Sequence, residues 1–283
     1  MLYGLTIALA LCAATALPEG SDRLEVDTCR GKLDVFTYKP AAYRDGPLII
    51  VCHGVLRNAE EYRDHACEMA RRHGAIVAAP RFPDPPFSIE RYQRGGLILD
   101  GKAQSLDSCT WLALPDVVAE IRRRESRPKM PCYFIGHSGG AQFLIRLAGF
   151  LHTDVERIVV SNPGTYLTPS REAPFPFGFG NLPVSLSNDK IIERYLAQPI
   201  TLYLGDKDIE RDEHLDVTEW AQRQGATRFE RGQNVFQMAR KLADQKGWKF
   251  NWRMVVVPNI GHDHEGMFNH PLSAQALFGD KSK

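Results

Sequence analysis

The sequence predicts an α/β fold with a mostly parallel central sheet and helices on both faces. Short apolar runs, which suit strands covered on both sides, alternate along the chain with segments of helical periodicity. Strands that alternate with helices build parallel sheets through right-handed crossovers. No linker or internal repeat divides residues 17–283, so we expect one domain over that range.

The composition excludes several classes of protein. The chain has 283 residues, of which 43% are hydrophobic, and 35 basic against 34 acidic side chains give a formal charge of +1. This composition rules out disordered, collagen-like and coiled-coil chains. The two signs of charge are interspersed, so no strong field recruits nucleic acid or an anionic membrane. We therefore expect no nucleic-acid partner and a small-molecule or oligomeric substrate. The sequence leaves the oligomeric state open.

The N-terminus resembles an export signal. Residues 5–17 are apolar, and Ala14-Thr15-Ala16 supplies the small-x-small pattern of a cleavage site. We expect residues 1–16 to be a signal peptide, cleaved after Ala16, and the protein to be secreted or periplasmic. Since the first four residues contain no Lys or Arg, an uncleaved anchor or a different start remains the alternative. The run is shorter than the ~20 residues of a spanning helix, so no stable membrane insertion is expected.

Five cysteines remain after such a cleavage, and an odd number cannot all pair within one chain. Cys52 and Cys132 lie in apolar runs, where a cysteine usually behaves as a small hydrophobe. A disulfide is therefore expected among Cys29, Cys67 and Cys109. The sequence contains no C-x-x-C spacing for zinc or redox chemistry.

The elements can be placed in order along the first half of the chain. Alternating residues in 23–29 and 32–40 predict two strands joined at Arg30-Gly31 as an edge hairpin. The elements expected next are a strand over 47–54, a helix over 58–72 with Asn58 at its cap, a strand over 75–80, and a helix over 114–124 with Pro115 in its first turn.

The second half continues the alternation. Its expected elements are strands over 132–138, 155–162, 199–205 and 252–259, a helix over 141–152 and a helix within 232–246. Two stretches interrupt the pattern, at residues 83–101 and 165–184. Long insertions in compact α/β domains often form lids or binding loops, so we expect one here.

Gly136-His137-Ser138-Gly139-Gly140 matches G-x-S-x-G, and its context makes the match informative. It follows a predicted strand and precedes a predicted helix, which is the setting of a nucleophile elbow. Glycines are needed there because the serine backbone is strained and neighbouring elements leave little room. The helix N-terminus favours developing negative charge. The alternative is a Gly-Ser turn that only links strand to helix.

A serine nucleophile needs a base to take its proton and an acid to orient that base. The loop after residues 199–205 offers Asp206 and Asp208, and the loop after residues 252–259 offers His262 and His264. We favour Asp208, because an Asp directly after a glycine more often caps local backbone. We favour His262, because the first histidine past the strand is best placed to reach Ser138. His264 then takes a supporting or surface position.

The tetrahedral intermediate requires backbone N–H donors. We expect the amide of Gly139, directly after the nucleophile, and the amide of Val55, with Leu56 as the alternative. His53 precedes that loop. We interpret it as a residue that shapes the loop through hydrogen bonds, because a base before the serine would break the expected chain order.

Four aromatic residues are candidates for a substrate-binding wall. Tyr166 lies in the loop after the strand over 155–162, and Phe175, Phe177 and Phe179 lie in the insertion that follows. They could hold an acyl or aromatic group. The alternative is that they pack the insertion onto the body of the protein.

Two further groups of side chains have simpler interpretations. Arg228 and Arg231 flank a predicted helix start, where they could hold local carboxylates. The run His262-Asp263-His264 has no further metal ligands at a suitable spacing, so no metal site is expected.

Taken in order, these motifs resemble the α/β-hydrolase superfamily and, within it, secreted esterases similar to polyhydroxybutyrate depolymerases. The resemblance spans residues 46–268, and the segments that carry it are HGVLRNAEEYRD, GHSGGAQF, SNPGTYLTP, LGDKD, GATRFERGQN and PNIGHDHEGMF. It implies an α/β-hydrolase fold and a triad of Ser138, Asp208 and His262. It also implies hydrolysis of carboxylic esters through an acyl-enzyme, with no metal or organic cofactor.

Two other functions compete with the esterase hypothesis. A peptidase or thioesterase can use the same scaffold, because the triad does not record the leaving group. A non-catalytic binding protein can also keep the fold. That alternative is disfavoured, because Ser138, Asp208 and His262 are all present.

Overall fold

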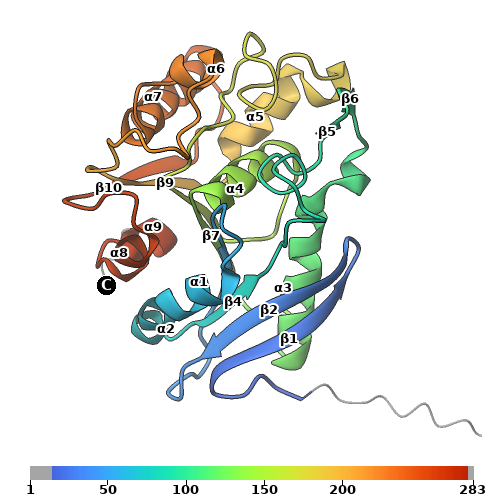
Figure 1. Ribbon diagram of the computed structural model, residues 1–283, viewed down its shortest axis with the longest axis vertical. Coiled ribbons are helices and arrows are strands. Elements are labelled where there is room, and N and C mark those ends of the chain that lie inside the picture. Colours follow the sequence, from blue (N-terminus) through green and yellow to red (C-terminus); the bar gives the residue numbers. More distant parts are fainter. Residues whose placement is uncertain (1–14, 280–283) are drawn as a thin grey trace, which may run out of the picture.

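The computed structural model describes residues 15–279, and the predicted signal peptide lies almost wholly outside this range. One sheet of eight strands in the order β1-β2-β4-β3-β7-β8-β9-β10 forms the centre of the molecule (Figure 1). β1 pairs antiparallel with β2 and β2 with β4, and the pairs from β4 to β10 are parallel. The mostly parallel α/β sheet predicted from the sequence is confirmed.

The strands of the main sheet are β1 (Gly20–Thr28), β2 (Gly31–Lys39), β3 (Leu48–Cys52), β4 (Ile76–Pro80), β7 (Cys132–His137), β8 (Arg157–Ser161), β9 (Ile200–Gly205) and β10 (Trp252–Val257). A small second sheet contains β5 (Ile98–Leu99) and β6 (Lys102–Ala103). The α-helices are α1 (Ala59–His65), α2 (Cys67–His73), α3 (Ala113–Arg124), α4 (Gly139–Phe150), α5 (Asp189–Ala197), α6 (Glu219–Gln222), α7 (Arg228–Lys246), α8 (His264–Asn269) and α9 (Ser273–Phe278). Short 3₁₀ turns cover Leu106–Ser108, Thr110–Leu112 and Val184–Leu186.

Helices cover both faces of the sheet, as the apolar strands predict. In β3, Ile50 and Cys52 face a core shared with α3, α4, α5 and α7, whereas Ile49 and Val51 face a core shared with α1, α2, α8 and α9. All five residues of β3 are buried. Burial of each large aliphatic side chain contributes roughly 1.5–3 kcal/mol, so both cores hold the central strands in place.

Two predicted helices differ from the structure by more than a residue or two at their ends. The segment over residues 58–72 forms two helices, α1 and α2, separated at Ala66. Asn58 occupies the N-cap position of α1, but its Nδ2 donates to Glu61 Oε2 at 2.9 Å instead of capping the backbone. Helix α7 begins at Arg228, before the predicted range, because Thr227 Oγ1 accepts the backbone N–H of Glu230 and caps it there.

The predicted disulfide is wrong for the described chain. Over residues 15–279 every cysteine is free. Cys29 is exposed whereas Cys109 is buried. The thiols of Cys67 and Cys109 lie against local carbonyl oxygens, those of Arg63 and Ser105. Each thiol therefore has a partner close to it in the chain.

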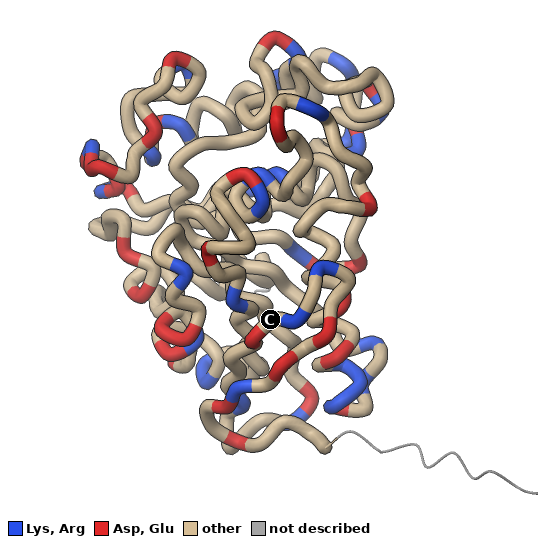
Figure 2. Tube along the Cα trace, turned by 45° about the vertical axis from the view of Figure 1, so that its right-hand side comes forward, with Lys and Arg blue, Asp and Glu red and all other residues tan. Residues whose placement is uncertain are grey.

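Charged residues of both signs are spread along the chain in Figure 2, in agreement with the mixed pattern in the sequence. In the part of the chain that the structure describes, no helix combines the length and the apolar character needed to cross a bilayer.

Candidate active site

Ser138 lies in a sharp turn between β7 and α4. Its backbone has φ 54° and ψ −116°, in the left-handed region that costs a non-glycine residue energy. A Cβ on Gly140 would lie 2.1 Å from the carbonyl oxygen of Cys52, and a Cβ on Gly136 would lie 2.5 Å from the carbonyl carbon of Gly140. Only glycine fits at these two positions. The structure therefore has the strained, tightly packed strand–turn–helix geometry that the motif predicts.

The acid and the base favoured from the sequence lie side by side. Asp208 Oδ2 is 2.8 Å from His262 Nδ1, and the Asp208 side chain is only 1% exposed. A carboxylate only accepts hydrogen bonds, so Nδ1 carries the proton and Nε2 is left to take one. His262 and Ser138 line the same cavity of about 180 Å³. This arrangement can activate a serine hydroxyl.

Asp206 and His264, the alternatives to Asp208 and His262, have other partners. Asp206 Oδ1 accepts the backbone N–H of Asn259 at 2.7 Å, which is the local capping expected of an Asp directly after a glycine. His264 Nε2 faces His65 Nδ1 at 2.9 Å. Burial lowers the pKa of His264, and the neighbouring His65 lowers it further.

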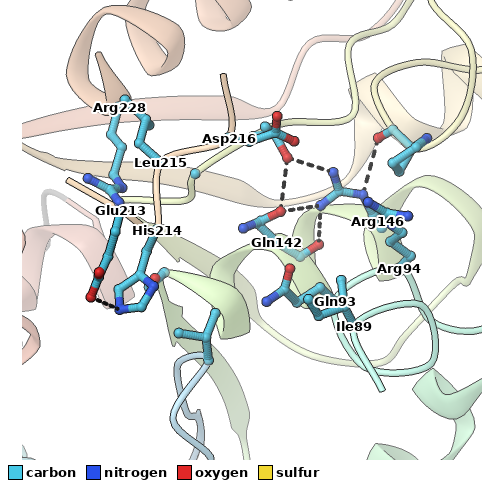
Figure 3. Close-up of a pocket in the computed structure, with 15 residues that line it drawn as sticks. Ile89, Gln93, Arg94, Gln142, Arg146, Glu213, His214, Leu215, Asp216 and Arg228 are labelled. Carbon is cyan, nitrogen blue, oxygen red and sulfur yellow. Dashed lines mark hydrogen bonds and ion pairs between the residues drawn. The ribbon is translucent and has the colours of Figure 1, made fainter. Parts of the chain in front are cut away.

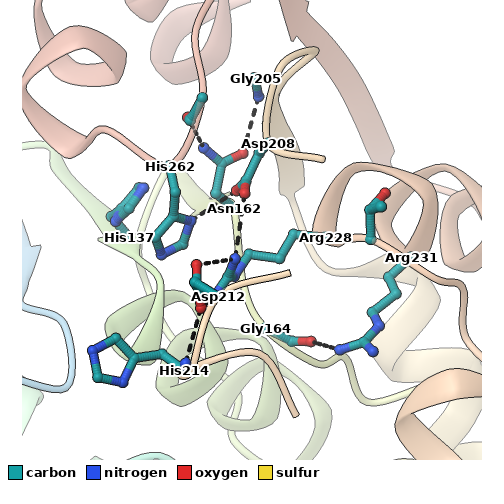
Figure 4. Close-up of polar contacts among 12 residues, drawn as sticks. His137, Asn162, Gly164, Gly205, Asp208, Asp212, His214, Arg228, Arg231 and His262 are labelled. Carbon is teal, nitrogen blue, oxygen red and sulfur yellow. Dashed lines mark hydrogen bonds and ion pairs between the residues drawn. The ribbon is translucent and has the colours of Figure 1, made fainter. Parts of the chain in front are cut away.

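Asn162 ties the two loops that carry Asp208 and His262. Its side chain is buried, its Oδ1 accepts the backbone N–H of Gly205 at 2.9 Å, and its Nδ2 donates to the carbonyl of Gly261 at 3.2 Å (Figure 4). One amide therefore fixes the spacing between the end of β9 and the turn before His262.

Arg228 extends from the start of α7 toward Asp208 (Figure 4). Its Nη1 lies 3.5 Å from Asp208 Oδ1, and its guanidinium donates to both oxygens of Asp212 at 2.7 Å. These hydrogen bonds lower the pKa of Asp212 to about 2. The expected role of holding carboxylates is confirmed for Arg228. Arg231 donates instead to backbone carbonyls, including that of Gly164.

A second imidazole packs against His262. The ring of His137 lies 4.5 Å from the ring of His262, centroid to centroid, and His137 is buried. Burial lowers the pKa of His137 well below its usual value, and His262 lowers it further. His137 is therefore neutral, and it supports the ring of His262 without adding charge beside it.

The two predicted oxyanion donors lie next to each other. A Cβ on Gly139 would be 3.2 Å from the amide nitrogen of Val55, so the two backbone segments meet beside Ser138. A Cβ on Gly54 would be 3.8 Å from the Cβ of Ser138. Val55 lines a cavity together with Ser138, and the side chain of Leu56 is 72% exposed.

His53 shapes the loop before Val55, as expected. It is fully buried, its Nε2 accepts the backbone N–H of Phe82 at 3.0 Å, and its Nδ1 donates to the carbonyl of Gly54 at 2.9 Å. Burial lowers the pKa of His53 to about 3, so the ring is neutral at physiological pH.

A larger cavity of about 320 Å³ opens beside Ser138 and has a polar lining (Figure 3). The polar side chains that line it include Gln93, Arg94, Gln142, Arg146, Thr165 and Asp216. Arg146 is 1% exposed and donates to the carbonyl of Pro176 and the hydroxyl of Thr165. Burial lowers the pKa of Arg146 to about 9, with a further contribution from Arg94. The cavity therefore contains a buried guanidinium held by neutral partners.

The predicted aromatic wall does not line this cavity, whose described lining contains none of Tyr166, Phe175, Phe177 and Phe179. Tyr166 and Phe179 are fully buried, and Phe150 contacts the rings of both Phe175 and Phe179. The four aromatics pack the insertion onto the body of the protein, the alternative left open by the sequence. The aromatic side chains of the insertion therefore contribute to its packing.

Other residues of the cavity were not singled out from the sequence. Both predicted insertions contribute, with Gln93 from residues 83–101 and Thr165 from residues 165–184. Gln142 lies four residues after Ser138, on the same face of α4, and that helical spacing is the signal that could have identified it. The segment 213–216 carried no such signal, because it is an irregular loop after β9.

Comparisons with known proteins identify chains of similar sequence and fold. The chain is similar to LpqC, a poly(3-hydroxybutyrate) depolymerase from Bordetella parapertussis, with 32% identity over 91% of this chain and 90% of that chain and a TM-score of 0.82. It is also similar to poly(aspartic acid) hydrolase-1 from Sphingomonas sp. KT-1, with 25% identity over 89% and 96% of the two chains and a TM-score of 0.83. The siderophore hydrolase EstB from Aspergillus nidulans shares the fold, at 15% identity over 95% and 97% of the chains and a TM-score of 0.56. No protein-family model and no curated protein matches the chain.

Proposed function

The chain belongs to the α/β-hydrolase family of serine esterases, and from this premise we propose that it is a secreted carboxylic-ester hydrolase with a triad of Ser138, Asp208 and His262. The observation that carries the proposal is the 2.8 Å contact between Asp208 and His262, beside a serine in a strained elbow. Two similar structures, a depolymerase and a hydrolase, support the same reaction class.

The proposed reaction proceeds in two steps. His262 Nε2 takes the proton of the Ser138 hydroxyl as its oxygen attacks the ester carbonyl, and Asp208 stabilises the imidazolium that forms. The amides of Gly139 and Val55 stabilise the oxyanion. The tetrahedral intermediate then collapses, the ester C–O bond breaks, and the imidazolium gives its proton to the departing oxygen, which leaves as the alcohol. A water molecule, activated by the same histidine, hydrolyses the acyl-enzyme and restores Ser138.

The polar cavity beside Ser138 supports a substrate with a short or polar acyl part. A long alkyl chain packed against Gln93, Gln142 and Thr165 would displace the water around their polar atoms. The alkyl chain itself offers no hydrogen bonds to replace those of the water. Leaving a buried polar group without a partner costs about 1–3 kcal/mol. Short oligoesters, whose carbonyl and hydroxyl groups can pair with these side chains, fit the lining better.

The surroundings of Leu17 support export and processing. The Leu17 side chain is 3% exposed, and its backbone nitrogen lies 2.9 Å from Glu125 Oε1. Cleavage after Ala16 would convert that nitrogen into an α-ammonium group beside a carboxylate. The site is suited to a processed N-terminus at this residue.

An activity screen tests the proposed reaction. Purified protein is assayed against p-nitrophenyl esters of graded acyl length, with Ser138→Ala as the matched control. We expect the butyrate ester to be cleaved at least about tenfold faster than the dodecanoate ester, equivalent to about 1.4 kcal/mol, and Ser138→Ala to lose this activity. Cleavage of thioesters or peptides but not of esters would contradict the ester assignment.

A further inference from the structure

Three potential metal ligands meet outside the residues assigned to ester hydrolysis. Glu61 and His65 are four residues apart on α1, so they lie on one face of that helix. His264 is the first residue of α8 and comes from the opposite end of the chain. One ligand atom from each of the three lies within 4.8 Å of the others.

Two of the three distances between these atoms are close to those around a bound ion, and the third, between Glu61 and His65, is within 4.8 Å. His65 Nδ1 is 2.9 Å from His264 Nε2, and His264 Nε2 is 3.8 Å from Glu61 Oε1. Ligand atoms around a tetrahedral zinc ion lie roughly 3.3 Å apart, given bond lengths of about 2.0–2.1 Å. Shifts of a few tenths of an ångström would therefore bring both pairs to that spacing.

Neighbouring side chains orient each of the three ligands. Glu61 Oε2 accepts a hydrogen bond from Asn58 Nδ2 at 2.9 Å, which leaves Oε1 toward the cluster. His65 Nε2 lies 3.6 Å from Glu265 Oε2, so a carboxylate faces the nitrogen opposite the cluster. The ring of His264 stacks on Tyr62, with centroids 4.0 Å apart and planes within 6°. A carboxylate that faces the second ring nitrogen, as Glu265 does at His65, favours one ring orientation and tautomer of a metal-bound histidine.

We propose that Glu61, His65 and His264 bind one divalent transition-metal ion of the Zn²⁺ type. Two imidazoles with one carboxylate suit zinc, cobalt, nickel or copper, whereas magnesium and calcium prefer all-oxygen sites. The inference goes beyond ester hydrolysis, because the ion has no role in the proposed reaction. No sequence motif indicates this site, since His65 and His264 are 199 residues apart.

The position of the site suggests what the ion does. Helix α1 follows the loop that contains Val55, and α8 follows the loop that contains His262. An ion shared between the two helices ties these loops together at one point. We therefore expect it to stabilise the folded protein by binding the native state.

Metal binding is measured directly, without an activity assay. Untagged protein is stripped with a chelator and titrated with ZnCl₂ by calorimetry, and the visible absorption of a Co²⁺ complex reports the coordination. We expect one equivalent to bind and the melting temperature to rise. His65→Asn and His264→Asn should each weaken binding by more than tenfold. Glu265→Gln should weaken it by about tenfold, as loss of an orienting carboxylate does.

Two controls separate this site from others. His152→Asn removes an exposed histidine outside the cluster, and His262→Asn removes the histidine assigned to catalysis. Both variants should bind Zn²⁺ as the parent protein does. The proposal is overturned if the parent protein binds no ion, or if the folded His65→Asn and His264→Asn variants bind equally well. Loss of binding only in His262→Asn would place the ion elsewhere and would also overturn it.

Discussion

Asp208 Oδ2 and His262 Nδ1 lie 2.8 Å apart although the two residues are 54 positions apart in the chain. They meet because β9 and β10 are parallel neighbours, so the loops after their carboxyl ends emerge at the same edge of the sheet. Asn162 hydrogen-bonds to the backbone at Gly205 and Gly261 and holds the loops at that spacing. The acid and the base of the proposed triad are therefore positioned by the sheet.

The first prediction concerns the identity of the acid. Asp208→Asn should lower kcat by about 10⁴-fold, because the histidine loses the carboxylate that fixes its tautomer. Asp206→Asn should keep kcat within about tenfold, because Asp206 only accepts the N–H of Asn259. Steady-state kinetics give kcat for both variants, and melting temperatures confirm that both are folded. If the two phenotypes were exchanged, Asp206 would be the orienting acid.

The second prediction concerns Arg228, which we regard as a positioning residue for Asp208. Arg228→Met removes the cation beside two carboxylates and should lower kcat by about tenfold or more, with KM little changed. Arg231→Met is the matched control, since Arg231 is equally buried on the same helix but binds backbone carbonyls. Both variants should lose stability, because each leaves buried polar groups unpaired. An unchanged kcat in folded Arg228→Met would contradict the positioning role of Arg228.

Much of the fold and the core of the site could be predicted, because both depend on local patterns. Buried strands are continuous apolar runs, and the motif around Ser138 requires glycines that the sequence displays. Contacts between residues that are far apart in the chain leave no such pattern in the sequence. The insertion looked like a substrate wall because it is aromatic, yet burial of Tyr166 and Phe179 is decided by elements far away in the chain. The pairing of Asp212 with Arg228 was hidden for the same reason.

The third prediction concerns the mature N-terminus. Protein recovered from its native host should begin at Leu17, with its α-ammonium group paired to Glu125. Glu125→Gln should then lower the melting temperature by several degrees, because the pair is partly buried and Glu125 also binds Lys39 at 2.7 Å. Glu60→Gln, at an exposed position, is the control. Mass spectrometry showing an intact Met1 would contradict the processing site.

The fourth prediction concerns pH. The pKa of buried His53 is about 3, below its ordinary 6.5, so the unfolded chain binds this proton first as the pH falls. The contribution of His53 to stability is complete above about pH 6.5 and is lost between about pH 6.5 and 3, at up to about 1.4 kcal/mol per pH unit. Urea unfolding at pH 7, 6 and 5 gives the free energy of unfolding of the parent protein and of His53→Asn, and the slopes of that free energy against pH are compared. The variant should show the shallower decline, and equal slopes would contradict the assignment.

The proposed function depends above all on Ser138 being an activated nucleophile. The most direct measurement is the intact mass of folded protein after reaction with a fluorophosphonate, which attaches covalently to a serine hydroxyl that a neighbouring base activates. We expect one adduct per chain, located on Ser138 by peptide mapping, and none on Ser138→Ala. No adduct on protein that hydrolyses esters, or an adduct retained in Ser138→Ala, would contradict it.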